Sequence, residues 1–188
     1  MDSEATFVTP AIVRIDCTDA DELSERVSDW SIELKHLVPG DFAASLVLIP
    51  LGPALIGCGR FSKPMLVRTS PPEGCLTIAR PGRGSAALYH HGSAVEDGQV
   101  FACGPGAEHE SVGLGARYPM TLSIRCDLLA RETDWLSHSS LPAAQGSSQT
   151  HEPGVAWTTS YLDAMEWIID AVERYPEATL YGDRKSVV

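Results

Sequence analysis

The sequence predicts a mainly β fold with helices, in which a small antiparallel barrel is followed by C-terminal α-helices. Short apolar runs alternate with Gly- and Pro-containing turns through most of the chain, at a spacing of roughly 8–12 residues. This pattern is typical of all-β barrels and sandwiches. Beyond a polar stretch at 137–153, apolar residues recur every third or fourth position from Trp157 to Tyr175, which indicates an amphipathic helix.

Composition bounds the class of protein. The 188 residues, 44% hydrophobic and 21% charged, suit one soluble domain with an appendage. No apolar run approaches the roughly 20 residues that span a bilayer, and residues 1–6 lack the basic and apolar segments of a signal peptide. We therefore expect a cytoplasmic protein with no membrane partner. The net charge of −11 argues against direct contact between this chain and nucleic-acid phosphates.

Five cysteines are spread through the chain without a C-x-x-C pair. This spacing does not suit a structural zinc site, which needs paired, closely spaced ligands. Cys58, Cys75 and Cys103 lie in apolar, strand-like runs. We expect them to be reduced thiols packed in the core.

Regular structure is expected to begin with a short strand at Ile12–Ile15. Thr18 then offers an N-cap, and acidic residues follow it at the positive end of the helix dipole. The resulting helix should run to Ser28, with Leu23 and Val27, one turn apart, facing inward.

The strands that follow are read from apolar runs bounded by Pro, Gly and Ser. A helix is expected after the last of them, from Asp127 to about Trp135, because Asp is a good N-cap. The predicted strands are Ile32–Leu37, Phe42–Leu51, Ala54–Phe61, Lys63–Arg68, Cys75–Arg80, Ala86–His91 and Pro119–Cys126.

The segment Glu96–Glu110 organises the barrel. Asp97–Gly98 predicts a tight turn, because glycine reaches positive φ and Asp bonds its own backbone. Gln99–Cys103 reads as a buried strand, Gly104–Gly106 (G-P-G) as a reversal and Glu108–Val112 as a returning strand. This succession indicates the closing corner of a cupin-like or jelly-roll barrel. The mouth of such a barrel is a place where a small ligand or a metal is often held.

The domain organisation follows from the change in composition. We expect a sensing barrel at 1–135, a flexible linker at 136–155, and a helix with the start of a further region at 156–188. Four apolar residues of this helix recur at intervals of 3, 4 and 3, as in a coiled-coil seam. The helix either packs on its own barrel or forms a dimer interface, and both are possible together. The four residues are Leu162, Met165, Ile169 and Val172.

A metal centre is the sharpest catalytic hypothesis. Two ligands on one face of a strand must be at positions i and i+2, so the adjacent His90 and His91 cannot both enter the barrel. With His91 facing inward, its partner on that face is Tyr89, a poor metal ligand. Glu96 and His109 lie further along in suitable places, which leaves the set one imidazole short. We therefore expect no cofactor, and keep His91, Glu96 and His109 as the alternative metal site.

Other chemistry has weaker support. The sequence contains no G-x-S-x-G elbow, and we predict no catalytic residue. Arginines on barrel strands can bind an anionic ligand through two parallel hydrogen bonds. Arg60 and Arg80, with Tyr89, His91 and His109, are the predicted ligand-binding residues; Arg125 is a further strand arginine.

The assembled pieces resemble the N-terminal effector-sensing domain of AraC-type transcription regulators, from about Asp16 to about Arg131. The order and spacing of the pieces carry the resemblance more than any single one. They are Asp19–Leu23 (D-A-D-E-L), Trp30, Leu37–Phe42 (L-V-P-G-D-F), Pro71–Thr77 (P-P-E-G-C-L-T), the Asp97–Gly106 corner and Asp127–Arg131 (D-L-L-A-R).

The resemblance implies a cupin-like barrel that binds a small effector, followed by helices for homodimerisation and then a helix-turn-helix DNA-binding domain. The helix through Leu162–Val172 resembles the dimerisation element, and Thr179–Val188 the lead into the DNA-binding half. The chain departs from the family by stopping there. We therefore expect a non-enzymatic domain that reaches DNA only through a region absent from this chain. A metal-dependent cupin enzyme is the competing hypothesis, and a barrel kept only for oligomer assembly is a third.

Overall fold

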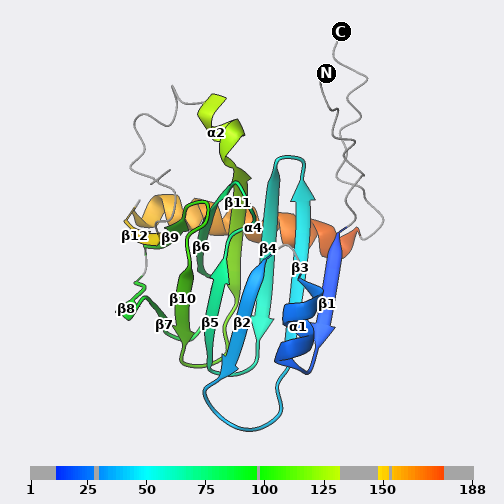
Figure 1. Cartoon of the computed structure of the whole chain (residues 1–188). Helices are drawn as coiled ribbons and strands as arrows, with labels where there is room; N and C mark the ends of the chain where they lie inside the picture. Colours follow the sequence, from blue (N-terminus) through cyan, green and yellow to red (C-terminus); the bar gives the residue numbers. More distant parts are fainter. Residues whose placement is uncertain (1–11, 28–29, 97, 132–147, 153, 176–188) are drawn as a thin grey trace.

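Two antiparallel β-sheets face each other, and a long helix lies across the outside of one of them (Figure 1). The computed structural model describes residues 12–27, 30–96, 98–131, 148–152 and 154–175. One sheet has seven described strands in the order β1-β3-β4-β11-β6-β9-β12, and the other has five in the order β2-β5-β10-β7-β8. The predicted mainly β fold with helices is confirmed.

The predicted strands are present in the structure. Their first and last residues differ from the predicted ones by a few positions at most. The seven-stranded sheet consists of β1 (Val13–Cys17), β3 (Ala44–Leu51), β4 (Ala54–Phe61), β6 (Cys75–Pro81), β9 (Val100–Cys103), β11 (Pro119–Arg125) and β12 (Ser148–His151). The five-stranded sheet consists of β2 (Ser31–His36), β5 (Met65–Ser70), β7 (Leu88–His90), β8 (Ser93–Ala94) and β10 (His109–Gly113). The helices are α1 (Ala20–Arg26), α2 (Cys126–Arg131) and α4 (Val155–Arg174).

The central strands of the seven-stranded sheet are apolar on both faces. On β3, Leu46 and Leu48 pack in the core between the sheets, whereas Val47 and Ile49 pack on the outside against α4. Successive side chains of a strand point to opposite faces. The sequence of β3 therefore requires two coverings, the second sheet on one side and a helix on the other.

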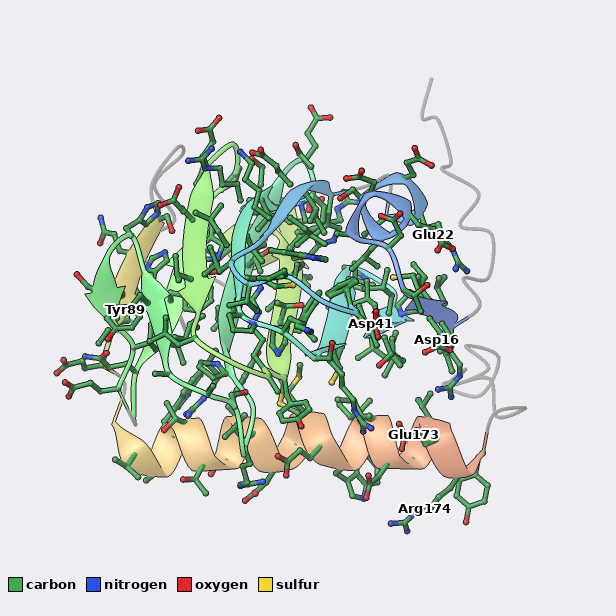
Figure 2. All side chains as sticks on the ribbon, turned by 90° about the horizontal axis from the view of Figure 1, so that it is seen from below. Asp16, Glu22, Asp41, Tyr89, Glu173 and Arg174 are labelled. Atoms are coloured by element: carbon green, nitrogen blue, oxygen red, sulfur yellow. The ribbon has the colours of Figure 1, made fainter. Side chains whose placement is uncertain are left out.

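Helix α4 supplies the outer covering. Its four seam residues are only 2–6% exposed and pack on Ile49, Ile56 and Met120 of the sheet. In Figure 2 the helix runs along the sheet from its N-terminal turn to Glu173 and Arg174. Of the two alternatives left open by the sequence, packing on its own barrel is confirmed. The seam predicted for dimerisation, Leu162, Met165, Ile169 and Val172, is buried inside the chain.

At the N-terminal end, α1 begins one residue later than predicted. The cap is Asp19, whose side chain accepts a hydrogen bond of 2.8 Å from the backbone N–H of Asp21, so Thr18 is not the N-cap. Leu23 and Val27 are buried, as predicted from their spacing.

The prediction of a flexible linker at 136–155 is wrong for residues 148–151 and for Val155. Ser148–His151 forms β12, which pairs with β9 so that Ser148 lies opposite Cys103, and α4 already begins at Val155. A polar strand of this kind is stable because backbone hydrogen bonds to β9 do not depend on apolar side chains. The remainder of the predicted linker, 136–147, and the predicted lead into a further domain, Thr179–Val188, lie outside the described residues.

Replacing Ile169 with alanine tests the covering role of α4. Ile169→Ala removes a buried side chain between helix and sheet and is expected to lower the free energy of unfolding by about 2–5 kcal/mol. Leu114, directly after β10, is 54% exposed, so Leu114→Ala should change the free energy of unfolding by less than about 0.5 kcal/mol. Urea unfolding of the two variants measures the difference, and equal effects would contradict the packing described here.

Candidate functional site: a cavity between the sheets

The Gly-Pro-Gly reversal carries the chain from one sheet to the other. It is closed by a 3.0 Å hydrogen bond from the Ala107 N–H to the Gly104 carbonyl, and Gly106 has a φ of 72°. The next strand, β10, places His109, Ser111 and Gly113 on its buried face. Polar groups therefore enter the space between the sheets, as expected for the corner of a barrel.

A cavity of about 100 Å³ lies in this space. Both sheets contribute to its walls, and one side is closed by Leu23 of α1 and by Val27, which caps the C-terminal end of that helix. Most of the lining side chains are aliphatic or aromatic. The apolar wall includes Ile32, Leu34, Leu46, Leu48, Phe61 and Val67.

Arg117 is the charged residue of this cavity. Its side chain is 6% exposed, its Nη1 donates a 3.3 Å hydrogen bond to the Ser111 hydroxyl, and its guanidinium lies 5.0 Å from the centre of the Phe61 ring. Gly113 makes room for it, because a Cβ at that position would lie 2.8 Å from Arg117 Cδ. Burial lowers the pKa of Arg117 to about 10, a value at which the side chain is still charged at neutral pH.

No carboxylate in the described part of the chain lies within ion-pair distance of Arg117. Three buried polar atoms that have no hydrogen-bond partner belong to residues lining the cavity: Nε of Arg117, Nε1 of Trp30 and Oγ1 of Thr69. Buried polar groups are nearly always satisfied in proteins. The three atoms themselves are covered by neighbouring atoms, so the uncompensated charge of Arg117 is the feature that indicates a polar ligand.

A second polar cluster lies at the β12 end of the same interior. The rings of His90 and His109 stack with centroids 4.8 Å apart, and Phe101 stacks on both at 4.7 Å. The two nitrogens of His90 are hydrogen-bonded to the hydroxyls of Ser148 (2.9 Å) and Thr150 (3.1 Å) from β12. The segment predicted as a linker thus satisfies a buried histidine.

Both buried histidines are neutral over the physiological range. Burial, helped by the neighbouring His91, lowers the pKa of His90 to about 4. Burial, with smaller contributions from His90, His91 and Arg117, lowers the pKa of His109 to about 3. Burial also raises the pKa of the Cys103 thiol, which lies 3.1 Å from the Ser148 hydroxyl.

The structure corrects the choice between the two adjacent histidines. His90, 3% exposed, faces the interior, whereas His91 is exposed. His91 and Gly92 have positive φ values of 46° and 80° and form the two-residue turn of the β7–β8 hairpin, so His91 is not part of the strand. In the described residues the group whose ligand atoms lie within 4.8 Å of one another is His90, Cys103 and His109. The alternative metal set of His91, Glu96 and His109 is not assembled.

The five predicted ligand-binding residues do not converge on one site. His109 is buried in the interior, while Arg60 is exposed and 4.0 Å from Glu173. Tyr89 lies at the other end of the molecule from Glu173 (Figure 2). The strand arginine Arg125 is paired with Asp127 at the surface.

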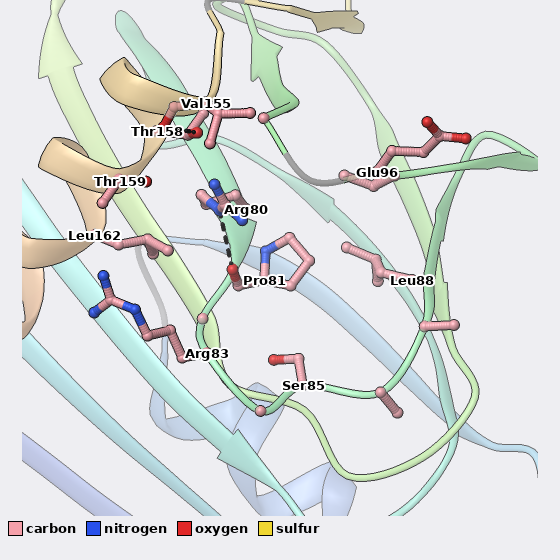
Figure 3. Close-up of a pocket in the computed structure, with 16 residues that line it drawn as sticks. Arg80, Pro81, Arg83, Ser85, Leu88, Glu96, Val155, Thr158, Thr159 and Leu162 are labelled. Atoms are coloured by element: carbon pink, nitrogen blue, oxygen red, sulfur yellow. Dashed lines mark hydrogen bonds between the residues drawn. The ribbon is translucent and has the colours of Figure 1, made fainter.

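Arg80 belongs to a different pocket, a groove of about 460 Å³ between the β6–β7 connection and the first turns of α4 (Figure 3). Its Nε donates a 3.1 Å hydrogen bond to the Pro81 carbonyl. Glu96 lines the far side, with its carboxylate directed away from Arg80 (Figure 3). Arg83, at the mouth of the groove, is paired with Asp163 and Glu166 of α4. The arginines of this groove are therefore committed to contacts within the protein.

Comparison with known proteins gives one structural likeness. The chain is similar to the crystal structure of the AraC-like transcriptional activator CuxR, with a TM-score of 0.52 and 18% sequence identity over 89% of this chain and 66% of that one. The two share a fold, and this chain spans about two thirds of the length of CuxR. No protein-family model and no curated protein matches the chain. No helix among the described residues is long and apolar enough to cross a membrane.

The buried histidines predict a loss of stability in mild acid. Because their folded pKa values lie below the unfolded value of 6.5, the unfolded chain binds more protons between about pH 6.5 and pH 4. The stabilisation is present in full above about pH 6.5. It should fall by up to about 1.4 kcal/mol per pH unit for each histidine as the pH decreases. Urea unfolding at a series of pH values in this range measures it.

Two variants assign this dependence. His109→Gln should flatten the decline, whereas His36→Gln, at an exposed position of β2, should leave it unchanged. If the slopes of wild type and His109→Gln coincide, His109 is not the group that takes up the proton.

Proposed function

We propose that this chain is the small-molecule-sensing part of an AraC-like transcription regulator, which reaches DNA only through a separate region. The observation that carries the proposal is the cavity between the sheets, with a buried arginine that has no counter-charge among the described residues. The fold shared with an AraC-like activator supports it. The net charge of −11 supports an indirect contact with DNA.

A path for the signal leads from the cavity to the end of α4. The cavity is closed by α1, which follows β1 after a two-residue connection. On β1, Arg14 Nη2 donates a 3.2 Å hydrogen bond to the carbonyl of Val172 in the last turn of α4. A ligand that changes how α1 packs therefore acts on β1, the strand that holds the C-terminal turn of α4. Through that turn it acts on the region of the regulator that follows α4.

Homodimerisation needs a surface other than the buried seam. We propose the outer face of α4, where Trp167 is 72% exposed and Trp157 is 41% exposed, with a second copy of the chain as the occupant. Large exposed apolar side chains are typical of protein contacts, and tryptophan is enriched at the energetic centres of interfaces.

The competing enzyme hypothesis needs a metal, and His90, Cys103 and His109 are the residues that would hold it. Two imidazoles and a thiolate suit zinc or copper. Against this, both nitrogens of His90 are engaged by hydroxyls, and burial raises the pKa of the thiol that would have to ionise. Purified protein is therefore expected to contain less than about 0.1 equivalent of any transition metal by elemental analysis, far below the one ion that a His₂Cys site requires. One equivalent, lost in Cys103→Ser, would favour the enzyme.

A reporter assay tests the regulator function. The chain is fused to a DNA-binding domain that represses only as a dimer, and repression is measured with a panel of small metabolites. We expect the fusion to repress and at least one compound to change repression several-fold. Trp167→Ser should abolish repression if the outer face of α4 is the interface. Leu37→Ser, which removes an exposed apolar residue directly after β2, in the sheet that α4 does not cover, should not.

Two results would overturn the proposal. One is a fusion that does not repress at all. The other is repression indifferent to every compound, both in wild type and in Val67→Phe, in which the larger side chain narrows the cavity.

A further inference from the structure

We propose that the cavity between the sheets binds a small monocarboxylate with an apolar body, whose carboxylate pairs with Arg117. This inference rests on the proposed function, because it names the chemical class of the effector for the same site. It is carried by the charge, the unsatisfied donors and the size of the cavity.

The charge requires an anion. Arg117 is 6% exposed, remains ionised at neutral pH and lies within ion-pair distance of no described carboxylate. A buried charge is costly unless it is paired. Burial is the cause of its lowered pKa, and no acidic group offsets it. A bound carboxylate would provide the missing counter-charge and would occupy the planar guanidinium through two parallel hydrogen bonds.

The side chain of Arg117 is not needed to extend the pairing of β4 with β11 in the seven-stranded sheet. This bridge is made by the backbone: the Phe61 N–H donates to the Arg117 carbonyl (2.9 Å), and the Arg117 N–H donates to the Phe61 carbonyl (3.0 Å). Any residue other than proline makes these bonds. Among the residues that the structure describes, the guanidinium itself has only the Ser111 hydroxyl and the Phe61 ring as partners. An apolar side chain of similar length would fill the same space without a buried charge.

The unsatisfied donors fit the same class of ligand. Besides Arg117 Nε, the indole N–H of Trp30 and the hydroxyl of Thr69 have no partner and belong to residues that line the cavity. These atoms are covered by their neighbours, so they reach a ligand only after their side chains turn. Trp30 precedes β2, and Thr69 lies on β5 opposite His109 of β10. An ionised carboxylate offers only acceptors, about four lone-pair sites on two oxygens. The donors around this cavity therefore match a carboxylate better than a neutral amide or an amine.

Size and wall limit the rest of the ligand. A cavity of about 150 Å³ lined by Leu, Ile and Phe is known to hold benzene, and this cavity measures about 100 Å³. Its wall is largely aliphatic. Because the cavity is smaller than the one that holds benzene, the apolar body is accordingly a short branched chain rather than a ring. An inorganic phosphate dianion would place two charges against one arginine and leave its remaining oxygens against apolar side chains, so it fits poorly.

Thermal unfolding and calorimetry of the purified chain test the inference with 3-methylbutanoate. This carboxylate should raise the melting temperature in a concentration-dependent way, because it binds only the folded state. 3-Methylbutanamide has the shape of 3-methylbutanoate without its charge and should bind at least about 30-fold more weakly, as expected when a buried charge loses its partner. Inorganic phosphate should not bind. This comparison uses only wild-type protein.

Variants assign the binding to Arg117. Arg117→Met keeps the aliphatic stem and removes the charge, so without ligand its melting temperature should equal or exceed that of wild type. Its affinity for the carboxylate should fall at least about 30-fold. The matched control is Arg68→Met, at an exposed arginine of β5 that pairs with Glu110 and Glu33. Its affinity for the carboxylate should equal that of wild type.

Several results would overturn the inference: 3-methylbutanoate not bound at millimolar concentration, 3-methylbutanamide bound as tightly as 3-methylbutanoate, or equal affinities of wild type and Arg117→Met. The failure of the proposed function looks different. If a carboxylate binds through Arg117 and the reporter fusion ignores it, the chain is a binding protein but not a sensor. If the reporter responds to other compounds and no carboxylate binds, the sensor proposal holds and the ligand class is wrong.

Discussion

The structure depends on the need to cover both faces of the seven-stranded sheet. Its central strands carry apolar side chains alternately inward and outward, as Leu48 and Ile49 of β3 show. Exposed, the outward set would form a large apolar patch of a kind that soluble monomers rarely carry. Helix α4 removes that patch by laying its own apolar face on it. Because the apolar seam of α4 is buried against the sheet, the helix can offer a partner only its opposite face.

The inner face presents the opposite problem, because polar side chains must be accommodated in an apolar space. The buried histidines avoid the cost of a buried charge by remaining neutral. In addition, His90 is hydrogen-bonded to two hydroxyls of β12. Arg117 has no such solution, since a guanidinium keeps its proton at any physiological pH. A charge that cannot be neutralised from within the described chain is the feature that distinguishes this cavity from an imperfectly packed core.

Much of the fold was predictable from the sequence, because alternation, turn residues and helical spacing are local signals. Residues 148–151 were not, since the hydroxyls of β12 look like those of a linker until their histidine partner is known. His91 was predicted on the inner face because strand alternation alone does not reveal that His91-Gly92 forms a turn, and a shift of one residue reverses every face. Arg117 was missed for a similar reason. It lies just before a strand, and its burial depends on the space left by Gly113 four residues earlier.

The same geometry indicates which part of the molecule can respond to a ligand. The sheets are held by long ladders of hydrogen bonds, whereas α1 is a seven-residue helix that closes the cavity with Leu23 and with Val27 at its C-cap. So short a helix is stable only through its packing. Under the proposed function, a ligand that fills the cavity would add to that packing and pair the buried charge, and both effects would favour the position of α1 seen in the structure. A ligand shifts an equilibrium only by its difference in affinity for the two states, and under this proposal that difference would arise at α1 and at Arg117 together.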